Sequence, residues 1–377
     1  MFKRLLYNRM YLFRDYKLAG LGEGMAYRWF TGRSRWLIWI WLLVGCGGSG
    51  SGGSSGSGSS GATGPSDGNS QGGGSTNPVI GGVGRIVFIR PVELGGPFHL
   101  FVVNPDGQNE VSLIDQTDLA NYTGPSWSPD GTQVAFASNV LEKGNYDILI
   151  INIDGSNRRR ISTNPSGDFA PAWSPDGQTL IYQSWRNNDT AWDIYSIKVD
   201  GTEEKNLTNF PGNDQLPTWS PDGLKIAFQS GINQGTDIYV MDADGSNRIR
   251  LTEGTGAQFS APAWSPDGTQ IAFESTRHQP APLPGQDPIA IFEIYVMGAD
   301  GKNIRRLTTT ASLIQAFRNP SWSPDGKQIV FEAQRREPQL GTGLFGLMVI
   351  GADGTNQFEI PNLGLLGGQF PRWSPVP

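Results

Sequence analysis

A chain of 377 residues is long enough for two or three average domains or for one large repeat fold. Residues 85–377 hold 21 basic and 32 acidic residues, a net charge of −11, and a negative field of that size argues against a nucleic-acid partner. The single cysteine, Cys46, allows no intrachain disulfide and no thiolate metal site. His99 and His278 lie far apart in the sequence, which is typical of surface or strand-end residues rather than of metal ligands, so we expect no metal and no cofactor.

A short uncharged segment, residues 36–45, leads up to the cysteine. It is too short to span a bilayer, which takes about 20 apolar residues. Three arginines, Arg28, Arg33 and Arg35, precede it, and a basic segment followed by a short apolar core is the layout of a secretory signal. The sequence therefore predicts a signal region over residues 1–45. Translation starts at Met1 or at Met25, and the second start would give a signal of ordinary length.

The end of that apolar core, Leu43-Val44-Gly45-Cys46, resembles the bacterial lipobox. The resemblance implies that Cys46 is acylated, becomes the new N-terminus and anchors the protein to a membrane. The alternative is a plain signal peptide followed by a buried or reactive free thiol. The chain from Gly47 to Gly74 is almost entirely Gly and Ser, which cannot bury apolar surface. Residues 46–84 are therefore predicted to be the lipidated cysteine and a disordered linker.

One sequence pattern recurs from residue 85 to the C-terminus. Trp-Ser-Pro-Asp-Gly begins at Trp127, Trp173, Trp219, Trp264 and Trp322, and a truncated copy begins at Trp373. The spacings are 46, 46, 45, 58 and 51 residues, and a proline stands two positions before every one of these tryptophans. In each copy Pro fixes φ at the second turn position, Asp suits the third and Gly accepts a positive φ. The pattern therefore predicts a strand, a tight turn and another strand.

Each copy continues with a loop, a third strand such as Asp237-Ile238-Tyr239-Val240, an Asp-Gly hairpin signal and a short fourth strand. Four short strands per repeat are typical of a β-propeller. Arg85–Phe88 resembles a second strand with no first strand before it, whereas Pro371–Ser374 resembles a first strand with nothing after it. We therefore expect residues 85–377 to form an all-β, six-bladed β-propeller of four-stranded antiparallel blades. The N- and C-terminal strands would close the ring in one shared blade.

The repeated Trp-Ser-Pro-Asp-Gly and Asp-Ile-Tyr segments resemble the WD-like β-propeller repeats of TolB-type proteins. The resemblance covers residues 85–377. It implies the propeller fold and, by analogy alone, a role in binding an envelope protein, since TolB-type proteins bind the peptidoglycan-associated lipoprotein. TolB itself carries an α/β domain before its propeller. In this chain the Gly/Ser-rich linker occupies that place, so the resemblance does not imply the whole role of TolB.

Residues repeated in every blade are expected to serve blade geometry, whereas binding residues concentrate on variable loops held by a rigid scaffold. The loops between second and third strands and between repeats share one face, and they include a Pro-rich insert at residues 277–292. Aromatic and Arg residues anchor interfaces. The predicted partner-binding residues on this face are Trp185, Arg186, Arg277, His278, Arg318, Arg335 and Arg336. The alternative for any one of them is a solvated loop residue.

These features predict a lipid-anchored binding module of the bacterial cell envelope, with its propeller on the periplasmic or extracellular side. The expected partner is an envelope protein or one associated with peptidoglycan, and no catalytic residue is predicted. The alternative is a propeller enzyme, a lyase or hydrolase, or a propeller that binds a small ligand. The scarcity of histidine argues against catalysis.

Overall fold

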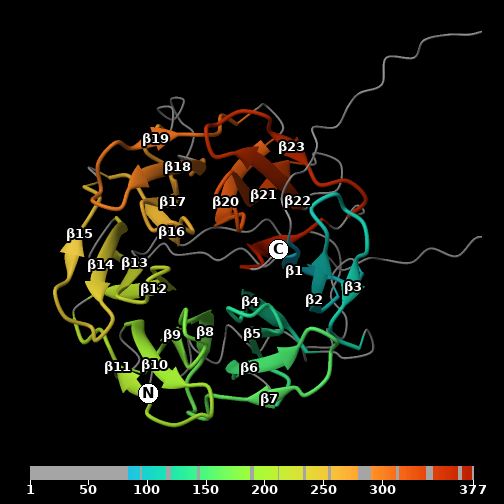
Figure 1. The fold of residues 1–377 in the computed structure, drawn as a ribbon, viewed down its shortest axis with the longest axis vertical. Helices are drawn as coiled ribbons and strands as arrows, with labels where there is room; N and C mark the ends of the chain where they lie inside the picture. Colours follow the sequence, from blue (N-terminus) through green and yellow to red (C-terminus); the bar gives the residue numbers. More distant parts are fainter. Residues whose placement is uncertain are drawn as a thin grey trace, which may run out of the picture.

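Six four-stranded antiparallel sheets surround one axis in the computed structural model (Figure 1). The structure describes residues 84–93, 96–115, 120–141, 145–186, 191–210, 212–231, 235–253, 256–278, 290–310, 314–336, 343–363 and 367–375. The predicted signal region, Cys46 and nearly all of the predicted linker lie outside the described residues. Within these ranges no helix is long and apolar enough to cross a membrane.

The six blades follow one another along the chain, and the strands of each blade run in order from the innermost to the outermost. Blade 1 consists of β24 (Gln369–Trp373), β1 (Ile86–Pro91), β2 (Phe98–Val103) and β3 (Val111–Ser112), and blade 2 of β4 (Tyr122–Trp127), β5 (Gln133–Ser138), β6 (Asp147–Asn152) and β7 (Arg159–Arg160). Blade 3 consists of β8 (Asp168–Trp173), β9 (Thr179–Ser184), β10 (Asp193–Lys198) and β11 (Lys205–Asn206), and blade 4 of β12 (Asn213–Trp219), β13 (Lys225–Gly231), β14 (Asp237–Asp242) and β15 (Ile249–Arg250). Blade 5 consists of β16 (Phe259–Trp264), β17 (Gln270–Ser275), β18 (Glu293–Gly298) and β19 (Arg305–Arg306), and blade 6 of β20 (Ile314–Trp322), β21 (Gln328–Arg336), β22 (Gly343–Gly351) and β23 (Phe358–Glu359).

The two ends of the repeat region close the ring, as the sequence predicts. Strand β24 pairs antiparallel with β1, with Trp373 opposite Ile86 and Arg372 opposite Val87. Beyond the paired residues, Ser374 N–H donates to the Arg85 carbonyl at 2.7 Å, and Arg85 N–H donates to Ser374 Oγ at 2.9 Å. The strand from the C-terminal end therefore completes the blade that the N-terminal end begins.

The Trp-Ser-Pro-Asp-Gly turns form as their residue types predict. In blade 2, Gly131 has a φ of 69° and its N–H donates to the Ser128 carbonyl at 2.9 Å, which closes the turn. The serine has a role that the sequence did not reveal. Ser128 Oγ donates to Asp130 Oδ1 at 2.6 Å and accepts the N–H of Gln133 at 2.9 Å. The serine hydroxyl thus ties the turn aspartate to the start of the next strand.

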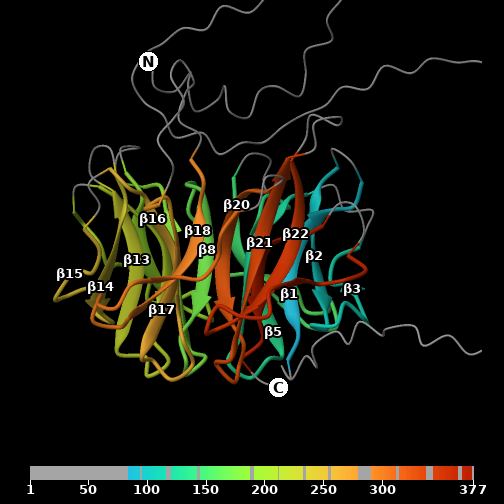
Figure 2. The same cartoon turned by 90° about the horizontal axis from the view of Figure 1, so that it is seen from above.

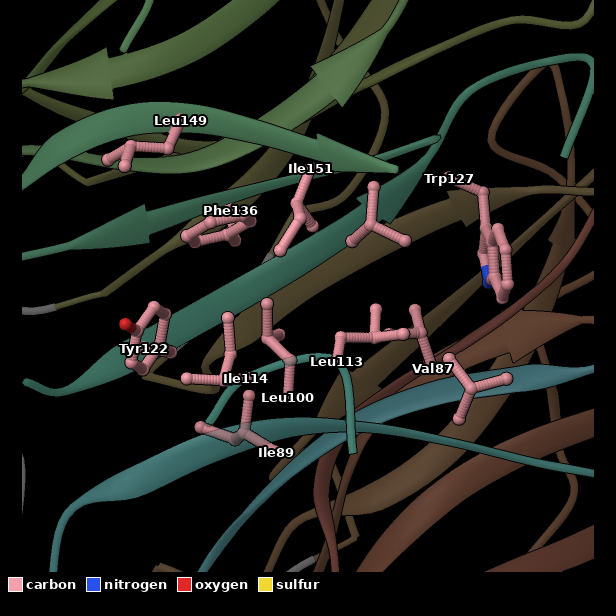
Figure 3. Packing of buried hydrophobic residues seen from close by; sticks show 12 residues of the cluster. Val87, Ile89, Leu100, Leu113, Ile114, Tyr122, Trp127, Phe136, Leu149 and Ile151 are labelled. Atoms are coloured by element: carbon pink, nitrogen blue, oxygen red, sulfur yellow. The ribbon is translucent and has the colours of Figure 1, made fainter. Parts of the chain in front are cut away.

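The hydrophobic core lies between neighbouring blades. One cluster joins Val87, Ile89 and Leu100 of blade 1 to Tyr122, Trp127 and Phe136 of blade 2 (Figure 3). Two of the six repeat tryptophans add polar links to this packing. Trp127 Nε1 donates to the Arg372 carbonyl at 2.9 Å, and Trp322 Nε1 donates to the Ala263 carbonyl at 3.1 Å, in both cases across to the innermost strand of the preceding blade. The recurring tryptophans therefore hold adjacent blades together.

Every innermost strand contains a bulge three residues before its tryptophan, where the pairing with the second strand shifts register. The bulge residue has a left-handed φ between 49° and 58° in all six strands: Gly124, Ala170, Leu216, Ala261, Asn319 and Phe370. A glycine or asparagine adopts this conformation easily, whereas the other side chains are strained by it. The bulge redirects the backbone of each strand at the propeller axis.

Blade 6 departs from the expected strand lengths. Its strands β20, β21 and β22 are nine residues long, whereas the corresponding strands of the other blades have five to seven. The pairing of β21 with β22 continues to Arg336 opposite Gly343. The sequence repeat marks only the part of each strand that is common to all blades, so this extension was not predicted.

Candidate functional site

The strands run between two unlike faces of the propeller (Figure 2). One face, the turn face, carries the Ser-Pro-Asp-Gly and Asp-Gly turns. Their aspartates are occupied by the turns themselves: Asp130 has a lowered pKa because it accepts hydrogen bonds from the Ser128 hydroxyl and the Thr132 N–H. The opposite face, the loop face, carries the connections of variable length. Residues that differ between blades are therefore concentrated on the loop face.

Six residues occupy equivalent positions around the axis, one on each innermost strand, four residues before its tryptophan. This inner ring consists of Thr123, Phe169, Gln215, Ser260, Arg318 and Gln369, and all six are half-buried. Arg318 is the one charged member of the ring. Because the blades follow in order around the axis, β8, which carries Phe169, lies across the ring from β20, which carries Arg318 (Figure 1).

The Arg318 guanidinium is held in place by two neighbours on blade 5. Its Nη1 donates to Glu274 Oε1 at 3.2 Å, and its Cζ lies 3.9 Å from the centre of the Phe292 ring. The carboxylate of Glu274 is 4 % exposed, whereas the side chain of Arg318 is 33 % exposed. A planar guanidinium fixed by a carboxylate and an aromatic face keeps other N–H donors for an incoming acceptor.

Two buried carboxylates meet next to Arg318. The Asn319 N–H donates to Glu274 at 2.9 Å, and Asn319 Nδ2 donates to Glu332 at 3.1 Å. Glu332 also accepts the Phe370 N–H at 3.0 Å. Burial raises the pKa of Glu332, and the Phe370 N–H and the charge of Arg318 oppose that shift. The group can therefore take up a proton more readily than an exposed glutamate does.

A second arginine lies in the axial interior. Arg372 stands on β24, directly before the last repeat tryptophan, where the other blades have Ser126, Ala172, Thr218, Ala263 and Ser321. Burial lowers the pKa of Arg372 to about 10, and the charges of Glu332 and Glu274 oppose that shift. The negative charges of Glu274 and Glu332 near the axis are thus matched in number by the positive charges of Arg318 and Arg372.

The predicted partner-binding residues lie on three different blades. Trp185 and Arg186 follow β9 in blade 3, Arg277 and His278 follow β17 in blade 5, and Arg318, Arg335 and Arg336 belong to β20 and β21 in blade 6. Arg277 and His278 are exposed. The side chain of Arg336 lies outside the described residues. The structure therefore spreads the seven residues over the loop face instead of gathering them into one cluster.

Several of these residues are engaged within the chain. Arg186 donates to Glu204 Oε2 at 2.5 Å, lies 3.5 Å from Asp168 Oδ1, and stacks on the Tyr195 ring at 4.2 Å. Arg335 pairs with Glu359. His278 Nδ1 is hydrogen-bonded to the Tyr295 hydroxyl at 2.7 Å. His99 lies near the start of β2, which agrees with the expected strand-end position, but it is completely buried and its ring packs against Tyr122.

The sequence did not single out Glu274, Glu332 or Arg372. A signal for the glutamates was present, because both directly follow the phenylalanine of a second strand, where blades 1 and 2 have Ile89 and Ala137. A charged residue inside an otherwise apolar strand marks a buried polar site. Among the described residues, no group of three or more His, Cys, Asp or Glu side chains is placed to hold a metal ion.

Comparison with known proteins points to one kind of propeller. No protein-family model matches the chain. A stretch of 75 residues is 36 % identical to the Tol-Pal system protein TolB of Zymomonas mobilis. The aligned stretch covers 20 % of this chain and 16 % of that protein. The solved structure of TolB from Acinetobacter baumannii superimposes with a TM-score of 0.62 at 22 % identity, over 77 % of this chain and 66 % of the other.

The same fold also occurs in an unrelated setting. The Kuenenia stuttgartiensis hydrazine synthase structure superimposes with a TM-score of 0.60 at 15 % identity, over 78 % of this chain and 47 % of that chain. The match to the curated TolB sequence spans less than a fifth of its length. The comparisons therefore establish the fold, whereas function has to be argued from the site.

Proposed function

Since the chain carries a six-bladed β-propeller of the TolB type, we propose that it is a protein-binding module of the bacterial cell envelope. The loop face is its binding surface, and acylated Cys46 is its membrane anchor. The partner is an envelope protein, and the first candidate is a peptidoglycan-associated lipoprotein, because the similar curated proteins are named as members of the Tol-Pal system.

One observation carries the choice of surface. Arg318 is the single cation of the inner ring, and Glu274 and Phe292 fix its guanidinium while a third of the side chain stays exposed. An arginine whose orientation is already set loses little conformational entropy when it binds an acceptor. Arg318 therefore suits a carboxylate or a backbone carbonyl of a partner that docks over the axis.

The entry point of the chain agrees with this orientation. Gly84, the first described residue, lies on the turn face, where a Cβ would be 3.0 Å from Ser374 Oγ and 3.1 Å from Pro324 Cγ. Pro324 belongs to the turn of blade 6. A tether that enters at the turn face leaves the loop face accessible on the opposite side, away from the anchor.

The experiment measures binding of the purified propeller to the soluble part of the peptidoglycan-associated lipoprotein of the same bacterium. Arg318→Gln should weaken binding at least about tenfold, equivalent to about 1.4 kcal/mol. Arg318→Lys keeps the charge but not the planar guanidinium, so its affinity should lie between those of the unmodified chain and Arg318→Gln. Lys302→Gln is the matched control, since this side chain on the turn face is 77 % exposed. Absence of binding by the unmodified chain, or equal losses in Arg318→Gln and the control, would refute the proposal.

A further inference from the structure

A second feature of the loop face is an aromatic cluster at the junction of blades 2 and 3, formed by Tyr146, Phe169, Trp185 and Trp192. The rings follow one another in contact: the ring centroids of Tyr146 and Phe169 are 4.7 Å apart, those of Phe169 and Trp192 5.6 Å, and those of Trp192 and Trp185 5.1 Å. The last two pairs are edge-to-face, with interplanar angles of 73° and 80°. All four side chains are half-buried, so the cluster has an accessible side.

Blade geometry does not require these rings. The residue before the third strand is Tyr146 in blade 2, Trp192 in blade 3 and Phe292 in blade 5, but Thr236 in blade 4. The residue after the second strand is Trp185 in blade 3, whereas blade 2 has Asn139 in that place. Since blade 4 folds with a threonine at the first position and blade 2 with an asparagine at the second, the repeat itself does not require an aromatic residue at either place.

The cluster is fixed by backbone hydrogen bonds to neighbouring strands. The Tyr146 carbonyl accepts the Asp168 N–H at 2.8 Å, and the Trp192 carbonyl accepts the Asp214 N–H at 2.9 Å. The Trp185 N–H donates to the Gly167 carbonyl at 3.3 Å. The rings are therefore positioned before any ligand arrives, which lowers the ordering cost of binding.

The size and charge of the cluster indicate what binds there. Aromatic side chains bury about 150–250 Å² each, so four rings that are each about a third exposed or less present on the order of 300 Å². A protein interface of standard size needs about 800 Å² from each partner. Arg186, which follows Trp185 in the chain, is already paired with Glu204 and Asp168. The aspartates next to the other three rings in the chain are completely buried: Asp147, Asp168 and Asp193. A narrow, uncharged ligand fits these features.

We infer that the aromatic cluster is a binding site for a glycan chain. The slightly positive C–H face of a pyranose ring stacks on the negative face of an aromatic ring. Polar side chains flank the rings: Thr123 and Gln215 hold the positions equivalent to Phe169 in the two adjacent blades, and Asn213 Oδ1 accepts the Trp192 N–H at 3.2 Å. Hydroxyl and amide groups beside a row of rings suit the hydroxyl groups of a neutral sugar.

The cluster shares Phe169 with the inner ring, but Trp185 and Trp192 lie outside that ring, and Phe169 belongs to blade 3 whereas Arg318 belongs to blade 6. The two proposals therefore fail independently. A chain that binds oligosaccharide but not the lipoprotein would refute the proposed function alone, and the reverse result would refute the glycan site alone.

The experiment is a calorimetric titration of the purified propeller with the soluble hexamer of β-1,4-linked N-acetylglucosamine. The unmodified chain should bind saturably with a Kd below about 1 mM. Trp192→Ala should weaken binding at least about tenfold, and Trp192→Phe, which keeps an aromatic face, should retain most of it. Phe210→Ala is the matched control, since Phe210 is a 48 % exposed aromatic residue on the loop face outside the cluster. Melting temperatures of all variants show that they are folded.

Three outcomes would overturn the glycan site. The first is no saturable binding of the hexamer by the unmodified chain. The second is an equal loss in Trp192→Ala and Phe210→Ala. The third is that decaproline, a rigid peptide of the kind that aromatic grooves also bind, binds at the cluster in place of the hexamer.

Discussion

Deleting residues 369–377 tests how the ring is closed. The deletion removes β24 and exposes the backbone edge of β1, which β24 covers in blade 1. It also removes Trp373, which is 5 % exposed, and loss of a buried tryptophan costs about 3–5 kcal/mol. Trp127 Nε1 and Arg85 N–H lose their acceptors, the Arg372 carbonyl and Ser374 Oγ, and each hydrogen bond lost costs about 0.5–1.5 kcal/mol. The sum is comparable with the whole stability of an ordinary domain, about 5–15 kcal/mol.

The truncated protein should therefore aggregate or unfold at a much lower denaturant concentration than the intact chain. The assay is chemical denaturation followed by tryptophan fluorescence, with size-exclusion chromatography to detect aggregates. Deletion of residues 47–74 is the control, because a Gly/Ser run buries almost no apolar surface and its loss should barely move the midpoint. Equal tolerance of the two deletions would refute closure by β24, and with it the explanation of how the blade edges are covered.

Two further predictions concern anchoring and pH. Cys46→Ser should release the protein from membrane fractions or leave it unprocessed, and a variant that fractionates and matures like the unmodified chain would contradict lipid attachment. Burial raises the pKa of Asp168 to about 6, against hydrogen bonds from Ser162 and Ser184 and the charge of Arg186. The folded state therefore binds this proton more tightly than the unfolded state, so this group should stabilise the fold by up to about 3 kcal/mol as pH falls from about 6 to about 4. Asp168→Asn should lack that rise in denaturation experiments across the same range, and an unchanged pH profile would contradict it.

The sequence was sufficient to predict the blades because each repeat contains its own markers. Pro, Asp and Gly set the turn, and the tryptophan two residues after a proline sets the innermost strand. The shared blade followed from the complementary fragments at residues 85–88 and 371–374. These features depend on residues that lie within a few positions of one another, so a local pattern is enough to recognise them.

The candidate sites depend on contacts between different blades, and a local pattern does not report these. Glu274 meets Arg318 and Asn319 from 44 and 45 residues away. Tyr146 meets Phe169 only because blade 3 packs beside blade 2. The sequence marked Trp185 and Arg186 as exposed loop residues, but whether such a side chain faces a partner or a carboxylate of its own chain is decided by the packing of the next blade.

The left-handed backbone conformation at the bulges bends each innermost strand at the axis and also turns a backbone N–H toward the neighbouring blade. A left-handed φ in a non-glycine residue costs on the order of 1 kcal/mol. It also turns the backbone N–H toward the preceding blade, where the Leu216 N–H donates to Gln183 Oε1 at 2.9 Å and the Phe370 N–H donates to Glu332 at 3.0 Å. Where the preceding blade offers Ile89 in place of such an acceptor, the bulge residue is Gly124, which adopts the conformation without strain. Ala170 is the exception, because it has a φ of 50° although the preceding blade offers Ala137 at that position. At Leu216, Asn319 and Phe370 the strain is thus offset by a hydrogen bond between blades. Two of the acceptors, Glu274 and Glu332, also hold the side chains of Arg318 and Asn319 in place. The hydrogen bonds that join these blades therefore place polar side chains inside the ring. The side chains of the inner ring take no part in these backbone hydrogen bonds, so they can differ from blade to blade.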